Sequence, residues 1–439
     1  MVNQGKPKLF YGWVVVFSIL CLQGAAIGIL GNTMSVFFRP VSEALGVSRS
    51  TFYLYNTFSA ITGMVMSPFW GEFFRNRKFK PYMILGSFTA AGTVFAYSYS
   101  TSIYHFYAIA MVNACFSGML MGVSIARILA NWFIEKRGLA TGIALSGSGL
   151  AGAIMTPIVS RTIENYGWRA GYRQLGICFF VITVPILVLL LKETPEEMGL
   201  KPLGWKPQDE QVTRDGGTLK SGMTRAQALR SKTFWCYALA LFMVQGCVMS
   251  TSNNVVNHLT DIGYSPAFAA GIFSILLFML VPGKPFLGFL YDRLGMARAT
   301  TINTLTMSVA PILLACTAIF RQATWLPYLY AVWFGSAYAI TSMQLPYMTP
   351  QLFGDKEFTR VYGIAQPFTM LGSALLVPVA NRAQEMIGSY VPVFFALSGG
   401  ILVALGLMHM AIRAAPEEIA RFDREDGIAP AAAVPAATA

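Results

Sequence analysis

Twelve long apolar segments constrain this chain more than any other feature of its sequence. Each is roughly 20 residues long or longer, the length that a helix needs to cross the hydrocarbon of a bilayer. Because a backbone in lipid must satisfy its own hydrogen bonds, and these segments show no alternation of apolar and polar residues, they are predicted to be helices. They occupy residues 12–38, 50–74, 81–99, 104–131, 138–163, 172–191, 233–258, 266–291, 298–319, 325–351, 361–386 and 390–413.

The composition supports a membrane protein and argues against a nucleic-acid-binding one. Only 12% of the residues are charged, whereas soluble proteins have about a quarter. The net charge of +12 comes from lysines and arginines spread over short loops rather than gathered on one face. Most of them fall on one side of the predicted helices, and the positive-inside rule then places both termini in the cytoplasm. The chain has no N-x-Ser/Thr acceptor sequence, which fits a bacterial inner membrane.

The six cysteines indicate neither disulfides nor a metal site. All of them lie within apolar segments and none forms a Cys-x-x-Cys pair. They are therefore interpreted as small packing residues, and no metal or cofactor is predicted.

One charged connector divides the segments into two groups of six. Residues 192–232, rich in charge, glycine and proline, are predicted to be a cytoplasmic loop between helical bundles at 1–191 and 233–415. Within this loop, Thr224–Lys232 is predicted to form a short surface helix. Residues 416–439 end in an Ala/Pro-rich stretch, which predicts a disordered cytoplasmic tail.

The two groups contain similar loop sequences, which indicates an internal repeat. Gly71–Lys78, after the second segment, is similar to Gly288–Arg298, after the eighth. Glu135–Gly142 and Lys356–Gly363 correspond at the starts of the fifth and eleventh segments. Two repeated halves are a known transporter plan, with the binding site between the halves near the bilayer midplane.

These motifs make the chain resemble the major facilitator superfamily. Gly288–Gly295 is similar to its G-x-x-x-D-R-x-G loop, although Arg75 stands where the first copy usually has aspartate. Tyr11–Val16, Asn131–Gly149 and His258–Ser265 resemble the monocarboxylate porters and the bacterial oxalate/formate antiporter branch. The resemblance implies an all-α membrane protein with twelve transmembrane helices in two six-helix repeats. It also implies secondary transport.

Lys284 is the first candidate for the substrate site. A charge within a membrane span usually faces an aqueous cavity or a partner. Pro282, Gly283 and Pro285 are expected to break the helix there and to free carbonyl groups. The resemblance implies that the position holds arginine in monocarboxylate porters, where it contacts the substrate carboxylate; lysine keeps the charge without the bidentate fork. The alternative is a lysine that extends to the membrane interface.

Arg127 is a second candidate cation, in the fourth segment. It too has an alternative role at the interface, close to the cytoplasmic end. If Arg127 and Lys284 both face the cavity, they come from opposite halves and would hold an anion between them. The oxalate/formate antiporter is expected to have a lysine in segment eleven, about where this chain has Thr369, so a singly charged substrate fits better than a dicarboxylate.

The acidic residues give no clear proton carrier. The resemblance implies an aspartate four residues before the span-eight cation in animal porters, and that position is Leu280 here. Asp261, at the outer end of segment seven, is a candidate for coupling, with a helix cap as the alternative. The resemblance to the loop motif implies that Asp292 and Arg293 take part in gating.

Five amide side chains within the spans are candidates for substrate contacts. Such groups need a polar partner or water in the membrane, but they also join helices, at roughly 0.6 kcal/mol each. They are Asn32, Asn113, Asn254, Gln344 and Gln366.

The predicted function is secondary transport of an organic monocarboxylate anion by alternating access, with proton symport. The alternatives are anion exchange of the oxalate/formate type and export of a bulkier compound; a receptor would bind without flux. Three histidines and no clustered carboxylates argue against an intramembrane enzyme such as an acyltransferase. The expected partners are a small organic anion, protons and the lipid bilayer, with the protein as a monomer.

Overall fold

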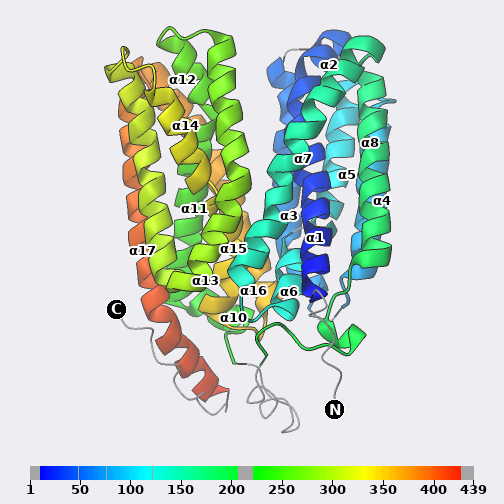
Figure 1. Ribbon diagram of the computed structural model, residues 1–439, viewed down its shortest axis with the longest axis vertical. Coiled ribbons are helices and arrows are strands. Elements are labelled where there is room, and N and C mark those ends of the chain that lie inside the picture. The colour runs from blue at the N-terminus through cyan, green and yellow to red at the C-terminus, as the bar shows by residue number, and fades with distance from the viewer. Residues whose placement is uncertain (1–9, 48, 76, 121, 206–220, 427–439) are drawn as a thin grey trace, which may run out of the picture. The chain divides into compact units, whose positions relative to one another are not determined.

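The computed structural model describes residues 10–47, 49–75, 77–120, 122–205 and 221–426, and the regular structure within them is helical (Figure 1). Two isolated backbone bridges join Phe133 to Leu203 and Gly222 to Gly354. The first-half elements are α1 (Gly12–Gln23), η1 (Gly24–Ile29), η2 (Asn32–Phe37), α2 (Phe38–Leu45), α3 (Arg49–Phe73), α4 (Lys80–Tyr97), α5 (Ile103–Leu120), α6 (Val123–Trp132), α7 (Arg137–Tyr166), α8 (Trp168–Pro185), η3 (Ile186–Leu190) and η4 (Pro195–Met198). They are followed by α10 (Arg225–Arg230), α11 (Lys232–Asn253), α12 (Val255–Asp261), α13 (Pro266–Ile319), α14 (Leu326–Ala337), α15 (Ile340–Phe353), α16 (Phe358–Ile387) and α17 (Val391–Glu425).

These helices account for all twelve predicted spans. Among the described residues, eight stretches are long and apolar enough to cross a membrane, and one of them, Phe268–Ile319, covers two predicted spans. Both lie in α13, whose two parts meet at Gly295, where φ is 79° and ψ is 169°. The remaining three predicted spans correspond to α3, to α4 and to the pair α14 and α15.

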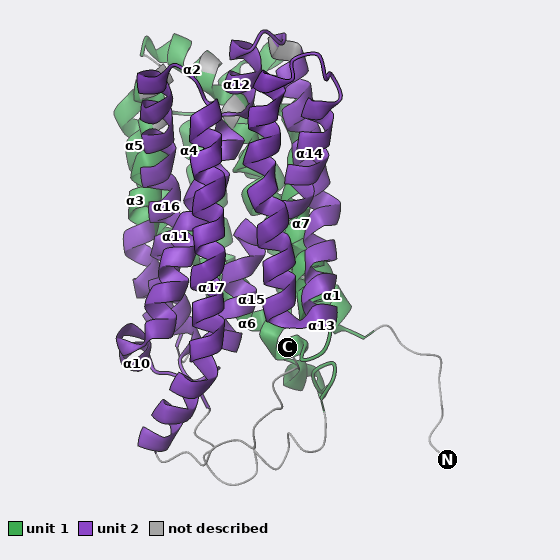
Figure 2. Ribbon diagram, turned by 90° about the vertical axis from the view of Figure 1, so that its left-hand side faces the viewer, with its two compact units in different colours: residues 1–63, 76–211 green, residues 64–75, 212–439 purple. Residues whose placement is uncertain are grey.

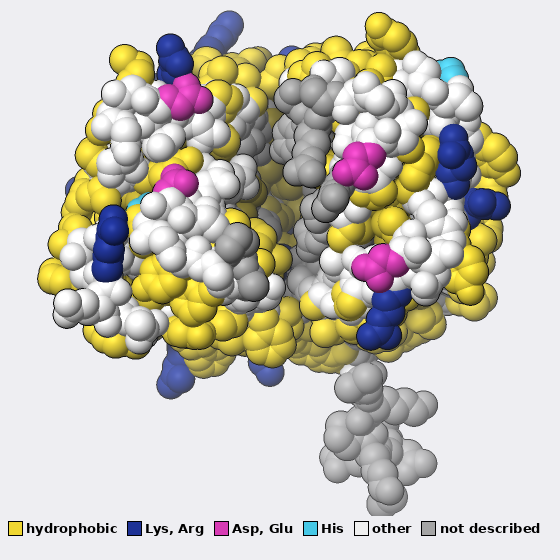
Figure 3. Space-filling model, turned by 90° about the horizontal axis from the view of Figure 1, so that it is seen from above, with side chains coloured by type: hydrophobic (Ala, Val, Ile, Leu, Met, Phe, Trp, Pro, Cys, Tyr) yellow, Lys and Arg dark blue, Asp and Glu magenta, His cyan; other side chains and the backbone are white. Residues whose placement is uncertain are grey.

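The chain forms two compact units (Figure 2). Unit 1 comprises Met1–Gly63 and Asn76–Gln211, and unit 2 comprises Met64–Arg75 and Val212–Ala439. Helix α3 therefore begins in unit 1, and its C-terminal part packs within unit 2. Large apolar side chains such as Phe17, Leu189 and Val379 are more than half exposed, as expected of surfaces that face lipid rather than water. Seen from above, acidic side chains lie on the end face, basic ones lie both there and at the rim, and hydrophobic side chains cover much of the periphery (Figure 3).

Glycines bring helices into backbone contact inside each unit. In unit 1, a Cβ atom on Gly147 of α7 would lie 2.0 Å from the carbonyl oxygen of Leu20 of α1. In unit 2, a Cβ atom on Gly372 of α16 would lie 2.1 Å from the carbonyl oxygen of Phe242 of α11. Since dispersion contacts replace the hydrophobic effect in lipid, such small residues favour close helix packing.

The predicted surface helix at Thr224–Lys232 is confirmed as α10. Its N-terminus has a capping box, in which the Thr224 hydroxyl accepts a hydrogen bond from the Gln227 amide and the Gln227 side chain accepts one from the Thr224 amide.

The prediction of a disordered tail from residue 416 is wrong for its first ten residues, because α17 continues through Pro416 to Glu425. The Glu418 carboxylate accepts the amides of Lys232 (2.9 Å) and Thr233 (3.1 Å) at the start of α11. Asp423 accepts the Gly222 amide (3.1 Å) and the Ser221 hydroxyl (2.5 Å). These long-range contacts stabilise the extension. Residues 427–439 of the predicted tail lie outside the described residues.

Candidate functional site

The first, fourth, seventh and tenth predicted spans are each interrupted within their length. The first changes from α-helix to π-helix at Gly24–Ile29, and the fourth breaks at Gly122, where φ is 67°. The seventh breaks at Asn254, and the tenth turns at Tyr338 and Ala339. Interrupted helices free backbone carbonyls, which membrane proteins tolerate where the helix is buried in protein or lines a cavity. These four spans therefore have backbone groups that are not paired within a regular helix.

The Asn254 side chain repairs the break in the seventh span. Its amide nitrogen donates to the carbonyl of Ser250 (2.9 Å), the acceptor that a regular helix would give to the backbone amide of residue 254. That backbone amide binds the carbonyl of Thr251 instead, at 3.3 Å. The side-chain oxygen accepts the Tyr390 hydroxyl (3.1 Å). Both ends of the Asn254 side chain are therefore hydrogen-bonded within unit 2. Its predicted contact with substrate stays a prediction.

Lys284 is buried, with 5% of its surface exposed. Its helix packs closely on α14, since a Cβ atom on the neighbouring Gly283 would lie 2.7 Å from the carbonyl oxygen of Ser336. Ser336 lies just before the turn in the tenth span, so Lys284 lies in the part of unit 2 where that span is interrupted. The expectation that Pro282 and Pro285 break the helix is wrong, because α13 is continuous there. Each proline still removes one backbone hydrogen bond, which frees a carbonyl one turn earlier.

Arg127 is half-buried on α6 of unit 1. The end of this helix is tied to the central loop, since the Trp132 indole nitrogen donates to the carbonyl of Lys192 (3.0 Å) and Asn131 donates to that of Glu193 (3.3 Å). Arg127 and Lys284 belong to different units, and a clamp that combines them stays a prediction.

Four other predicted amides also join elements. In unit 1, Asn32 donates to the carbonyl of Ser148 (3.1 Å), and Asn113 donates to the hydroxyl of Thr93 (2.8 Å). In unit 2, the buried Gln344 donates to the sulfur of Met408 (3.3 Å), and Gln366 accepts the hydroxyl of Ser67 (3.1 Å). These contacts fit the helix-joining role that was the alternative at the sequence level.

Sequence reasoning missed Gln23, which ends α1 just before the π-helix. It is buried, and its side-chain oxygen finds no hydrogen-bond partner among the described residues. The sequence signal that could have identified Gln23 was its amide side chain within a long apolar segment. The predicted coupling and gating residues Asp261, Asp292 and Arg293 are all exposed, and the Arg293 guanidinium lies 5.7 Å from the ring centre of Phe289.

The end of α3 packs on the start of α16 within unit 2, and we call this the α3–α16 contact. A Cβ atom on Gly71 would lie 2.6 Å from the carbonyl oxygen of Thr359, so only glycine permits this approach. One turn earlier along α3, Ser67 donates to the carbonyl of Gly363 (3.1 Å). Ion pairs surround this backbone contact.

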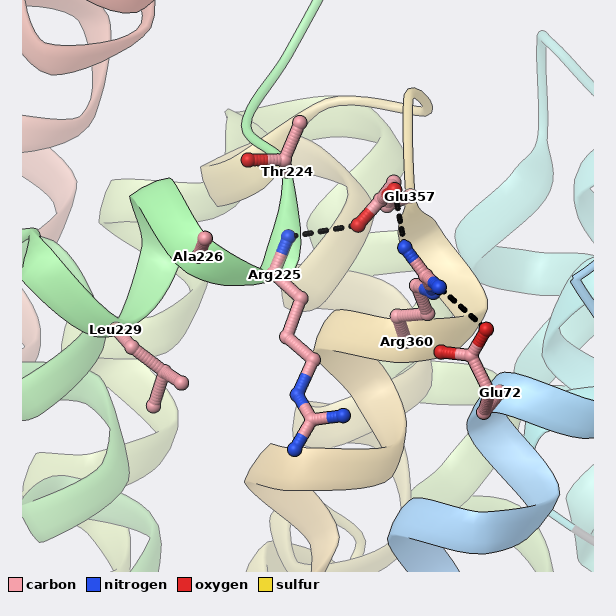
Figure 4. A pocket seen from close by; sticks show the side chains of 7 residues that line it. All are labelled: Glu72, Thr224, Arg225, Ala226, Leu229, Glu357 and Arg360. Carbon is pink, nitrogen blue, oxygen red and sulfur yellow. Dashed lines mark hydrogen bonds and ion pairs between the residues drawn. The ribbon is translucent and has the colours of Figure 1, made fainter.

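Arg360 is at the centre of those ion pairs (Figure 4). Its guanidinium donates to Glu72 of α3 and to Glu357 (2.6 Å), three residues earlier in its own chain segment. Glu357 also pairs with Arg75 (3.5 Å) and accepts the backbone amide of Arg225 (2.8 Å). A cavity of about 280 Å³ opens beside them, lined by Glu72, Thr224, Arg225, Ala226, Leu229, Glu357 and Arg360. The sequence signal was present for Glu72, Glu357 and Arg360, which lie in the repeated loops.

Comparison with known proteins agrees with this architecture. A family model described as Major Facilitator Superfamily matches residues 16–377. Monocarboxylate transporter 13 of Rattus norvegicus is 23% identical over 93% of this chain and 91% of its own length. The oxalate:formate antiporter of Oxalobacter formigenes is 26% identical over 75% of each chain. The solved structure of a proton:xylose symporter superposes with a TM-score of 0.71 at 12% identity, covering 92% of this chain and 96% of that one.

Proposed function

Because the chain belongs to the Major Facilitator Superfamily, and is a transporter rather than an enzyme, we propose that it moves an organic monocarboxylate anion across the membrane by alternating access. The relatives that cover most of the chain support this substrate class, since they include monocarboxylate transporters and an oxalate:formate antiporter. The observation that carries the proposal is the buried cation Lys284.

A buried ammonium group is costly in the membrane, and an anionic ligand reduces that cost. Lys284 lies on α13 with 5% of its surface exposed, which disfavours the alternative of a lysine extended into interfacial water. The adjacent prolines free carbonyls on the same helix. Lys284 would therefore bind the substrate carboxylate, and Arg127 and the amides Asn32, Asn113, Asn254, Gln344 and Gln366 would contribute further contacts.

A monoanion fits unit 2 better than a dianion. Thr369 lies on α16, and its hydroxyl donates to the carbonyl of Gln366 (2.7 Å), so this position supplies no positive charge. A second carboxylate buried without a cation would be strongly destabilised. Arg127 of unit 1 is the residue that would allow a dicarboxylate if it reached the same site.

Proton symport is the proposed coupling. Leu280 is a buried apolar residue at the position where the resemblance implies an aspartate in animal porters. Another group would therefore carry the proton in this chain. Asp261 at the end of α12, a protonated substrate, or Lys284 would carry it. Exchange of one anion for another is the alternative, favoured by the resemblance to the oxalate:formate antiporter.

Gating would involve the α3–α16 contact together with Asp292 and Arg293. Because α3 begins in unit 1 and ends packed within unit 2, it would transmit a movement of one unit to that contact. We place the central loop and both termini on the cytoplasmic side of a bacterial inner membrane. The proposed oligomeric state is a monomer. The proposed bundle boundaries remain 1–191 and 233–415, with the loop 192–232 between them.

Uptake of labelled monocarboxylates into proteoliposomes, with and without an imposed pH gradient, tests the proposal. We expect uptake by the parent protein, loss of uptake in Lys284→Ala, and retention in Lys284→Arg, which keeps the charge. Arg382→Ala, at an exposed ion pair on α16, is the matched control and should transport normally. Equal uptake by the parent and Lys284→Ala would exclude Lys284 from the site. Uptake that needs anion inside the vesicle and ignores the pH gradient would favour exchange.

A further inference from the structure

Three hydrogen bonds to other parts of unit 2 hold residues 221–231, the end of the central loop. The Met223 amide donates to the carbonyl of Phe353 (2.8 Å), next to the start of α16. Asp423 of the α17 extension accepts the Gly222 amide, and Asp426 accepts the side chain of Gln227 (2.8 Å). This loop end is therefore an ordered part of unit 2.

The loop end reaches the α3–α16 contact through one backbone group. The amide of Arg225, the first residue of α10, donates to Oε2 of Glu357. The other carboxylate oxygen, Oε1, accepts the guanidinium of Arg360, whose second nitrogen binds Glu72 on α3. The side chain of Glu357 is only 9% exposed, so few other groups compete for its oxygens.

We propose that the backbone amide of Arg225 positions Glu357, which in turn orients Arg360 toward Glu72, so that the central loop controls the strength of the α3–α16 contact. Glu357 is thus a positioning residue for gating, and the loop is a regulatory element rather than a passive connector. A hydrogen bond to one oxygen restricts rotation of the carboxylate and fixes where the other oxygen meets Arg360. The inference rests on the proposed function, because it assigns the control of a gating contact.

The position of Arg225 allows that single hydrogen bond to be removed. Proline is favoured at the first position of a helix, where its missing amide breaks no helical bond. The preceding Thr224 has φ −71° and ψ 163°, the extended conformation that a residue before proline prefers. Arg225→Pro therefore deletes the donor to Glu357, whereas Arg225→Ala deletes only the side chain and keeps the donor.

Hydrogen–deuterium exchange of the full-length protein in proteoliposomes provides the test. The measured amides are those of Phe69–Arg75 at the end of α3, which belong to a different helix from the substitution. One hydrogen bond to a charged group corresponds to roughly a ten- to hundredfold change in an opening equilibrium. We expect exchange to accelerate by about that factor in Arg225→Pro relative to Arg225→Ala. Equal exchange in the two variants overturns the proposal.

Glu357→Gln supplies an independent variant if α10 tolerates proline poorly. It should accelerate the same amides, and adding Arg225→Pro to it should produce little further change, because both act on one connection. Full additivity of the two substitutions overturns the proposal. Glu385→Gln, in the exposed pair at the far end of α16, is the matched control and should leave these amides unchanged.

Transport kinetics distinguish a gating role of Glu357 from a purely structural one. Arg225→Pro should change the turnover number relative to Arg225→Ala with little effect on KM, because the substrate contacts are untouched. A change confined to KM contradicts a gating role. A parent protein that transports no monocarboxylate overturns the function proposed above, whereas the exchange comparison needs no substrate and is decided by the α3 amides alone.

Discussion

Replacement of Gly372 by alanine should destabilise unit 2, although alanine is ordinarily the better helix former. The added Cβ atom would lie 2.1 Å from the carbonyl oxygen of Phe242, 2.9 Å from its carbonyl carbon and 3.1 Å from the amide nitrogen of Gly246. Helices α11 and α16 must therefore separate by about 1 Å to reach van der Waals distance. The obstructing atom is backbone and cannot rotate away. Overpacking of this kind costs about 1–3 kcal/mol.

Gly406 of α17 is the matched control, because a Cβ atom there meets nothing within 4 Å. Alanine at this exposed helical position should be neutral or stabilise the protein by up to about 1 kcal/mol. The two variants should therefore differ by about 1–4 kcal/mol in the free energy of unfolding. Thermal unfolding in detergent, followed by tryptophan fluorescence, measures the difference. Equal midpoints for Gly372→Ala and Gly406→Ala would refute the backbone-contact argument.

Two further predictions concern hydrogen bonds in unit 2. Tyr390→Phe removes the donor to the buried oxygen of Asn254 and should cost about 1–3 kcal/mol of stability; if a second substitution, Asn254→Ala, adds its full separate cost, the hydrogen bond is not what was lost. Hydrogen bonds from Gln227 and Lys356 lower the pKa of Asp426 below its ordinary value of 3.8. The stabilising effect of Asp426 is therefore present above pH 3.8 and lost as the pH falls through the lowered pKa, so proteolysis of the segment around α10 should accelerate there, and Asp426→Asn should weaken this pH dependence.

Local sequence identified the predicted substrate residues, but it did not identify their hydrogen-bond partners. Lys284 was identifiable because a charge in a long apolar segment is rare, and the structure places it in the interior. The amides were identifiable for the same reason, but their partners were not. Asn254 and Tyr390 are far apart in sequence, so only the packing of α17 against α11 and α12 shows that this amide is already bonded.

The α3–α16 contact illustrates the same limit. Glu72, Glu357 and Arg360 all lie in loops that the internal repeat had marked as similar, yet no sequence pattern indicates that they pair. The prolines beside Lys284 show the opposite error. Their local preference predicted a broken helix, and the surrounding packing keeps α13 continuous.

Reading the sequence is enough to establish that this chain forms transmembrane helices, that there are twelve of them in two repeats, and that a cation lies within the eighth. Hydrophobic length and charge are local properties, and the bilayer acts on each segment separately, so no tertiary contact is needed to deduce them. The packed helices were needed to show that α17 extends to Glu425, that Tyr390 donates to Asn254, and that the Arg225 amide donates to Glu357. These features depend on hydrogen bonds and ion pairs between distant residues, whose energies arise only when the helices are packed together.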